Sequence, residues 1–218
     1  MKNFVLFLLS VCSLNQAGAI NLQNGDLLFR QPCSKESVSS AIMNVTRSAG
    51  SYQFTHVGIV YIPKGTDSIF VIEATPPRVR MVPLETFLQP DNKTKCLPLT
   101  IVGRLKSEYQ NSIPSALQEA LVLIGKEYDD GFILENDKFY CSELIYHIFR
   151  KANNNRPLFE LNVMTFKQPD SNQVDKDWQR YFDEKKLEIP EGKSGINPGA
   201  MSRSPAIDLL GEIKTSQE

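Results

Sequence analysis

The chain has 218 residues, and its 24 Lys or Arg and 25 Asp or Glu give a net charge of −1. This length fits one domain, and 41% apolar with 22% charged residues is typical of a globular protein. A nucleic-acid partner is disfavoured because there is no basic excess. Two histidines and four cysteines, without a C-x₂-C spacing, are too few for a zinc-finger array. We therefore expect no metal and no cofactor.

Residues 1–19 are predicted to be a secretory signal peptide. Lys2 precedes a short apolar run over residues 4–9, and residues 17–19 (Ala-Gly-Ala) form a cleavage pattern. The alternative is lipidation at Cys12, although Val11 stands where a lipoprotein signal has Gly or Ala. No later stretch is long enough to span a bilayer. We expect an exported protein, periplasmic or secreted, without a transmembrane segment once the signal is removed.

Residues 20–218 are predicted to form one domain. In chain order, the hydrophobic periods and turn residues predict a strand over 26–30, a helix over 34–48, strands over 55–62, 68–74, 78–82 and 97–105, and helices over 113–124, 139–152 and 175–186. The segment 189–218, rich in Gly, Pro and Ser, is predicted to be an ordered loop or a C-terminal arm. Strands in the middle with helices around them favour an α+β fold with a mainly antiparallel sheet.

Cys141 lies at the start of the helix predicted over 139–152. Residues 141, 144, 145, 148 and 149 share one apolar face, which places Cys141 at the edge of the buried surface. Unpaired backbone N–H groups and the helix dipole favour a thiolate at this position and could hold an oxyanion. The alternative is a small buried core residue, which free cysteines often are.

His56 is the histidine that could serve this thiol. His147 is six residues beyond Cys141, about 240° around the helix, and cannot face it. A symmetric hairpin loop centred on residues 64–65 would place His56 directly opposite Glu73, with Cβ atoms about 4.5–5.5 Å apart. A carboxylate there would orient the imidazole. Taken singly, His56 is a half-buried strand residue and Glu73 a solvated one. A loop with an odd number of residues would put Glu73 on the opposite face of the sheet from His56.

Four segments in this order carry a family resemblance: residues 25–29 (Gly-Asp-Leu-Leu-Phe), 55–60 (Thr-His-Val-Gly-Ile-Val), 73–74 (Glu-Ala) and 140–144 (Tyr-Cys-Ser-Glu-Leu). Together they resemble the permuted papain-like amidases, the YiiX/YaeF-like branch of the NlpC-type cysteine hydrolases. The resemblance implies a papain-like fold. It also implies that Cys141 is the nucleophile, His56 the base and Glu73 the orienting acid of an amide hydrolase that forms an acyl-enzyme.

The substrate is left open by the sequence. A peptide-like amide, such as a cell-wall peptide, or an N-acyl amide is expected. The alternatives are an acyl-lipid thiol hydrolase or acyltransferase, and a binding module that keeps the fold.

Candidate substrate contacts are Tyr128 and Asp129, whose alternative role is turn chemistry. Lys35 and Glu36 are candidates if the first helix packs beside the hairpin, and otherwise they are solvated. A disulfide between Cys33 and Cys96 would suit an exported protein, but no local pattern fixes their distance.

Overall fold

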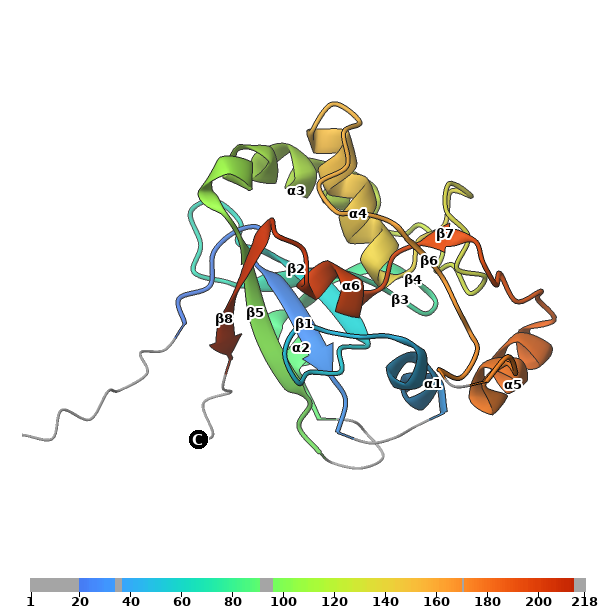
Figure 1. The fold of residues 1–218 in the computed structure, drawn as a ribbon. Coiled ribbons are helices and arrows are strands. Elements are labelled where there is room, and N and C mark those ends of the chain that lie inside the picture. The colour runs from blue at the N-terminus through green and yellow to red at the C-terminus, as the bar shows by residue number, and fades with distance from the viewer. Residues whose placement is uncertain (1–19, 34–36, 91–95, 170, 214–218) are drawn as a thin grey trace, which may run out of the picture.

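The computed structural model describes residues 20–33, 37–90, 96–169 and 171–213. Its centre is a six-stranded antiparallel sheet in the order β4-β3-β2-β1-β5-β8 (Figure 1). In chain order the elements are β1 (Leu27–Gln31), α1 (Ser37–Val45), β2 (His56–Tyr61), β3 (Phe70–Thr75), β4 (Arg78–Pro83), α2 (Leu84–Leu88), β5 (Leu99–Leu105), the 3₁₀ helix η1 (Ser107–Ser112), α3 (Ile113–Val122), α4 (Cys141–Ala152), β6 (Asn162–Val163), α5 (Lys176–Lys185), β7 (Ser194–Gly195), α6 (Pro198–Ser202) and β8 (Ile207–Glu212).

The predicted α+β class with a mainly antiparallel sheet is confirmed, and each predicted strand and helix has a counterpart. The segment 189–218 differs from the loop or arm expected, because it contains β7, α6 and β8. β8 pairs with β5 and forms an edge of the main sheet. The short strand of residues 207–212 lacks a clear alternating pattern, and its pairing with β5 decides its conformation.

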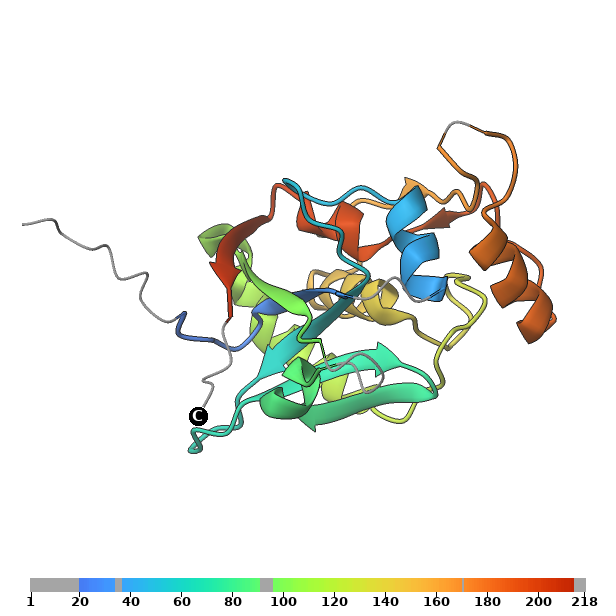
Figure 2. The same ribbon diagram turned by 90° about the horizontal axis from the view of Figure 1, so that it is seen from below.

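Both faces of the sheet are covered, which the alternation along β1 makes clear. Leu27 and Phe29 lie in the larger core, under α3 and α4, whereas Leu28 lies in a second core on the opposite face, with Phe87 of α2. Figure 1 shows α3 and α4 on the same side of the sheet. Figure 2 shows β3 and β4 as a hairpin at one edge of the sheet with α2 beside it. Burial on both faces explains why β1 and β2 are nearly continuously apolar.

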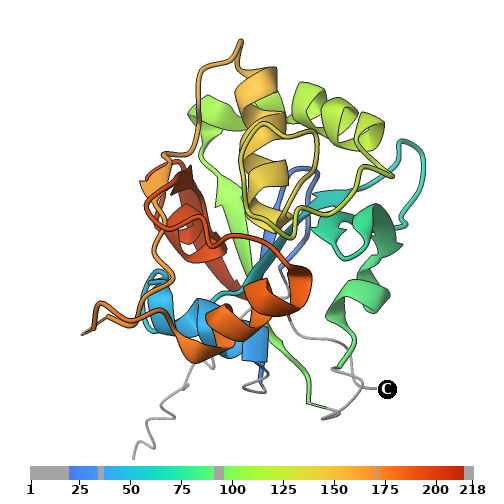
Figure 3. The same ribbon diagram turned by 90° about the vertical axis from the view of Figure 1, so that its right-hand side faces the viewer.

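A third, smaller core joins α1 and α5, which lie next to each other at one side of the molecule (Figure 3). Its buried members are Ala41, Met164, Phe166, Trp178 and Phe182. Phe132, from the loop before α4, packs against both this core and the larger one. Phe132 therefore lies between the larger core and the α1–α5 core and helps to set the space between them.

Cys33 and Cys96 form a disulfide, with their Cα atoms 6.1 Å apart. It joins the end of β1 to the segment that leads into β5, and the two cysteines are 63 residues apart in sequence. The sequence left this pairing open. The antiparallel pairing of β1 with β5, in which Gln31 lies opposite Leu99, brings the two segments together.

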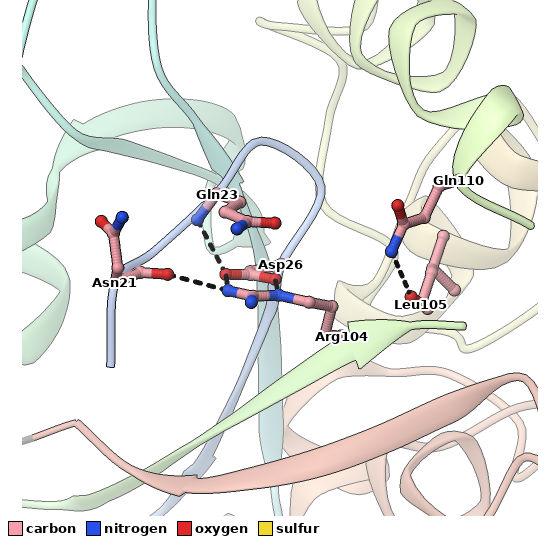
Figure 4. Close-up of polar contacts among 6 residues, drawn as sticks. All are labelled: Asn21, Gln23, Asp26, Arg104, Leu105 and Gln110. Carbon is pink, nitrogen blue, oxygen red and sulfur yellow. Dashed lines mark hydrogen bonds and ion pairs between the residues drawn. The ribbon is translucent and has the colours of Figure 1, made fainter. Parts of the chain in front are cut away.

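A buried ion pair holds the start of β1 (Figure 4). Asp26 is 1% exposed and accepts two hydrogen bonds from Arg104 of β5, Nε to Oδ1 at 2.7 Å and Nη2 to Oδ2 at 2.8 Å. Oδ2 also accepts from the backbone N–H of Gln23, and Arg104 reaches the carbonyl of Asn21. The pair therefore ties the segment before β1 to β5.

We expect Asp26→Asn to lower the free energy of unfolding by about 3 kcal/mol. The side-chain amide that replaces the carboxylate would point N–H groups at the N–H donors of Arg104 and leave the Arg104 charge unpaired. Asp137→Asn is the matched control. Asp137 pairs with Lys126, but its side chain is 76% exposed, so this substitution should lower the free energy of unfolding by about 1 kcal/mol or less. Urea unfolding of both variants measures the difference. Equal losses would contradict a structural role for the Asp26–Arg104 pair.

Candidate active site

Cys141 is the first residue of α4, and the cap of that helix fixes its place. Tyr140 is the N-cap residue, in extended conformation, and its backbone N–H donates to Oε2 of Glu143 at 3.4 Å. Tyr140 also accepts a hydrogen bond at its hydroxyl from the N–H of Ile196. Cys141 is 7% exposed and is the free cysteine among the described residues. Its thiol therefore sits at the positive end of a helix.

His56 and Glu73 are in direct contact. Nε2 of His56 lies 2.5 Å from Oε2 of Glu73, and the side chains are 20% and 4% exposed. The predicted register is wrong by two residues, because Tyr61 pairs with Phe70 and Ile59 with Ile72, which places Glu73 diagonally across the hairpin from His56. A shift of two positions keeps both side chains on the same face of the sheet, so the contact forms nevertheless.

Arg80 holds the other oxygen of the Glu73 carboxylate. Its Nε donates to Oε1 at 2.9 Å, and its Nη2 lies 2.8 Å from the same atom. Arg80 is on β4, directly opposite Glu73. Sequence reasoning missed this residue, although the tight turn at residues 76–77 between β3 and β4 sets this register. Each oxygen of Glu73 thus has a cationic partner, which fixes the rotation of the carboxylate.

The charges of this pair are strongly coupled. Burial disfavours a charge on His56, but hydrogen bonds to Cys141 and Glu73 outweigh it and raise the pKa of His56 from 6.5 to about 9. Burial likewise opposes ionisation of Glu73, yet His56 and then Arg80 lower its pKa from 4.5 to about 2. An imidazolium beside a carboxylate is therefore favoured at neutral pH.

Cys141 also contributes to the raised pKa of His56, and the two residues line the same cleft. Nε2 of His56 faces Glu73. Residues 141, 56, 73 and 80 thus form one group that extends from a helix N-terminus to the edge strand β4. The predicted members of this group, Cys141, His56 and Glu73, are brought together in the described structure.

An apolar cleft opens beside Cys141 and encloses about 720 Å³ of space that is continuous with solvent. It lies between the larger core and the α1–α5 core. Its apolar walls come from α1, the loop before α4, the β6 segment and α5; they include Ile42, Val45, Phe132, Val163, Met164, Phe166 and Trp178. No Lys, Arg, Asp or Glu is among the described residues that line it. The cleft thus offers a large apolar surface next to the thiol.

The other predicted contacts have different places. Tyr128 lines the cleft. Asp129 is 3% exposed, and its carboxylate accepts hydrogen bonds from the backbone N–H groups of Gly131 at 2.9 Å and Ile133 at 2.6 Å. This is the turn chemistry that the sequence kept as the alternative for Asp129, and it holds Phe132 in a left-handed conformation, with φ of 54°.

Three further expectations concern Lys35, Glu36 and His147. Lys35 and Glu36 lie outside the described residues. His147 lies away from Cys141, with Nε2 3.5 Å from Oε1 of Glu119 on α3 and its ring against Phe139. Phe132, Met164 and Trp178, which shape the cleft, were not singled out from the sequence, because their segments meet only in the folded chain.

Comparison with known proteins decides the family. A model of the permuted papain-like amidase enzymes, the YaeF/YiiX or C92 family, matches residues 21–211. The chain belongs to this family. It is thus a cysteine amidase of papain-like fold. Along the chain, the residues of the candidate site occur in the order His56, Glu73, Cys141.

Two relatives come from Escherichia coli. The uncharacterized protein YiiX of strain K12 is 31% identical over 152 residues, which are 70% of this chain and 69% of the relative. The crystal structure of a protein described as metalloprotein yiiX, from strain O157:H7, has a TM-score of 0.65 and 23% identity, covering 87% of this chain and 97% of that one. The second likeness shows the fold alone.

Within residues 20–33, 37–90, 96–169 and 171–213, no cluster of three or more His, Cys, Asp or Glu could hold a metal ion. The donor set that the described part of the chain offers therefore does not fit a resident metal.

We expect Glu73→Gln to lower the pKa of His56 from about 9 toward or below 6.5, because burial would then outweigh the remaining hydrogen bond to Cys141. An NMR titration of the imidazole signals measures this, and the chain has only one other histidine. Glu127→Gln is the control, since Glu127 pairs with Lys138 at the surface. An unchanged His56 titration in Glu73→Gln would contradict the coupling.

The same shifts set the pH dependence of stability. The raised pKa of His56 stabilises the fold below pH 6.5, and this contribution is lost as the pH rises through about 9. The lowered pKa of Glu73 stabilises it above pH 4.5, and this is lost as the pH falls through about 2. The free energy of unfolding that Glu73→Gln removes should therefore be largest between pH 4.5 and pH 6.5. It should shrink as the pH falls through about 2 or rises through about 9.

Proposed function

We propose that this amidase hydrolyses the amide bond of a substrate whose acyl side carries an apolar group, with Cys141 as nucleophile, His56 as general base and Glu73 as orienting acid. The observation that carries the proposal is the group of Cys141, His56 and Glu73 at the wall of an apolar cleft, whose described lining has no Lys, Arg, Asp or Glu. A nucleophile, a base and an orienting group in hydrogen-bond contact are what thiol hydrolysis requires.

The chemistry follows from these positions. His56 takes the thiol proton, and the thiolate attacks the amide carbonyl carbon. Backbone N–H groups at the start of α4 hold the oxyanion as it forms. His56 then gives its proton to the leaving amine, and the acyl group stays on the sulfur. A water molecule, deprotonated by His56, attacks the thioester and releases the acid. Glu73 stabilises the imidazolium in both halves of this cycle.

The lining of the cleft favours an apolar acyl group over a charged peptide. The carboxylates of a cell-wall peptide would find no Lys or Arg among the described lining residues. Burial of an apolar group against aromatic and aliphatic side chains yields roughly 25 cal/mol per Å². Because the acyl group occupies the site through both steps, this cleft would stabilise the amide complex and the acyl-enzyme alike.

An acyl-lipid substrate is the second candidate, and one observation favours it. Val163 lies on the wall of the cleft and is 71% exposed, which gives the cleft an apolar rim. Such a rim suits contact with a lipid surface. Hydrolysis of acyl amides and of phospholipid esters with the same acyl chain, compared side by side, separates the two substrate classes.

The hydrolysis test uses the purified chain with a panel of acyl amides of increasing chain length, read by mass spectrometry. We expect turnover to rise with chain length, and Cys141→Ala to lower it by at least about 10³-fold. The melting temperature of Cys141→Ala establishes that it is folded. Equal turnover by Cys141→Ala and the parent, or a preference for uncapped charged peptides, would contradict the proposal.

Thiol reactivity tests the triad without a known substrate. We expect iodoacetamide to alkylate Cys141 quickly near neutral pH, because His56 lies beside the thiol in the same cleft and can accept its proton. His56→Ala should slow the reaction by at least about tenfold, while His147→Ala, which changes the histidine that faces α3, should not. Intact mass reports the rate, since Cys33 and Cys96 are held in the disulfide. Equal rates in all three proteins would remove His56 from the mechanism.

We also propose that residues 1–19 direct export, although they lie outside the described residues. The Cys33–Cys96 disulfide supports this, because such bonds persist in oxidising compartments. Among the described helices, none is long and apolar enough to cross a bilayer. N-terminal sequencing of protein recovered from the periplasm or medium should begin at Ile20. A lipidated Cys12 at the N-terminus would instead establish the alternative processing.

A further inference from the structure

Asn197 is a polar residue of the apolar cleft that the proposed reaction does not yet use. It lines the cleft together with Cys141 and His56. Asn197 is the N-cap residue of α6, a short helix that packs against α4 (Figure 1). Because Cys141 is the first residue of α4, Asn197 belongs both to α6 and to the candidate active site.

The residue before Asn197 is hydrogen-bonded to both chain neighbours of Cys141. The N–H of Ile196 donates to the hydroxyl of Tyr140 at 3.2 Å. The carbonyl of Ile196 accepts from Oγ of Ser142 at 3.0 Å. Tyr140, Ser142 and Ile196 are all buried, so these bonds are shielded from water. Two buried hydrogen bonds thus hold the backbone that carries Asn197 against the residues on either side of the thiol.

The side-chain amide of Asn197 has a fixed orientation. Its Oδ1 accepts a hydrogen bond from the backbone N–H of Ala200 at 2.8 Å, which caps α6. Because this partner is an N–H group, the atom that faces it must be the oxygen, and Nδ2 lies on the other side of the planar amide. Nδ2 has no hydrogen-bond partner among the described residues. The cap therefore orients an N–H₂ group that is available to a ligand of the cleft.

Two other polar side chains of the lining have already used their donors. Nδ2 of Asn162 donates to the carbonyl of Val163 at 3.1 Å, and Oγ of Ser142 donates to the carbonyl of Ile196. The described lining also has no Lys or Arg that could meet a negative charge. Asn197 thus brings an open neutral donor to a part of the cleft where charge develops during amide hydrolysis.

We propose that Asn197 is a catalytic residue, and that its Nδ2 donates a hydrogen bond to the carbonyl oxygen of the scissile amide as this oxygen becomes negative. This inference rests on the proposed function. As the C–S bond to Cys141 forms, one electron pair of the C=O bond moves onto the oxygen. Nδ2 and the backbone N–H groups at the start of α4 hold this oxyanion together. When the C=O bond forms again, the C–N bond breaks and His56 protonates the leaving nitrogen.

The contribution of Asn197 should be larger in the transition state than in the bound substrate. A hydrogen bond strengthens as its acceptor becomes charged, and it strengthens further where apolar walls exclude water. Removal of one oxyanion donor typically lowers kcat by about 10²–10³-fold. The same oxyanion forms when water attacks the thioester, so Asn197 would act in both halves of the cycle. Its loss should therefore change kcat and leave KM nearly unchanged.

The experiment compares Asn197→Ser with Ser202→Ala, two substitutions that both affect α6. Serine is a good N-cap residue and keeps an oxygen for the N–H of Ala200, but it lacks the amide donor. Oγ of Ser202 donates to the carbonyl of Gly199 at 2.7 Å and accepts from the N–H of Ala49 at 3.0 Å. Ser202 is not among the described residues that line the cleft. Ser202→Ala therefore disturbs α6 without removing a donor from the cleft.

Two reactions of each protein are measured: hydrolysis of an acyl amide, and alkylation of Cys141 by iodoacetamide. Alkylation forms a C–S bond and releases iodide without an oxyanion, so it reports the position and ionisation of the thiol alone. We expect Asn197→Ser to lower kcat for the amide at least about 100-fold, with KM within about threefold of the parent. The rate and pH profile of its alkylation should match those of the parent.

Two further variants complete the comparison. Asn197→Asp keeps an oxygen for the cap of α6 but replaces the N–H₂ group with a second carboxylate oxygen, and it should lower kcat at least as far as Asn197→Ser. Ser202→Ala should keep kcat within about threefold of the parent. Melting temperatures of all variants establish that they are folded.

Three results would overturn the role of Asn197 and leave the proposed function intact. The first is an Asn197→Ser variant whose kcat stays within about threefold of the parent. The second is an alkylation rate that falls as much as kcat, which would make Asn197 a residue that positions the thiol. The third is an equal loss of kcat in Ser202→Ala, which would trace the effect to α6. Absence of amide hydrolysis by the parent chain would instead overturn the proposed function itself, and the role of Asn197 with it.

Discussion

The candidate active site depends on one buried carboxylate, Glu73. At 4% side-chain exposure this charge is expensive to bury alone, and it is stable because each oxygen meets a cation. His56 reaches it diagonally from β2 and Arg80 directly from β4, so three neighbouring antiparallel strands must have one register. That register turns the imidazole so that Nε2 faces Glu73. A slip of one residue in either hairpin would move a partner to the opposite face of the sheet.

The helix α4 supplies the remaining part of the candidate active site. Its N-terminus brings the thiol, the unpaired backbone N–H groups and the positive dipole end to the same point. The cap is held by Glu143, which is 3% exposed and whose pKa is raised to about 8 by burial and by the nearby charge of Asp129. Asp129 in turn organises the loop that inserts Phe132 between the two cores. The nucleophile and the wall of the cleft are thus positioned by neighbouring parts of one loop–helix unit.

The apolar cleft lies beside His56 and takes much of its wall from the α1–α5 core. In the proposed reaction this core contacts the acyl group, whereas the central sheet carries His56, Glu73 and Arg80.

The sequence by itself determined the elements and the fold class, and it predicted which side chains are reactive. Strand and helix periods are local, and with two histidines in the chain the choice of His56 over His147 needed only helix geometry. Hairpin symmetry predicted that Glu73 would share a face with His56, although the pairing is displaced by two residues, because the length of an irregular loop does not fix its centre.

Only the tertiary structure decided the place of β8, the bond between Cys33 and Cys96, the brace from Arg80 and the walls of the apolar cleft. These features join segments distant in sequence, such as Ile42 with Trp178, or Phe132 with Phe166. Their contacts arise from packing between elements, and packing leaves no period in the local sequence from which it could be predicted.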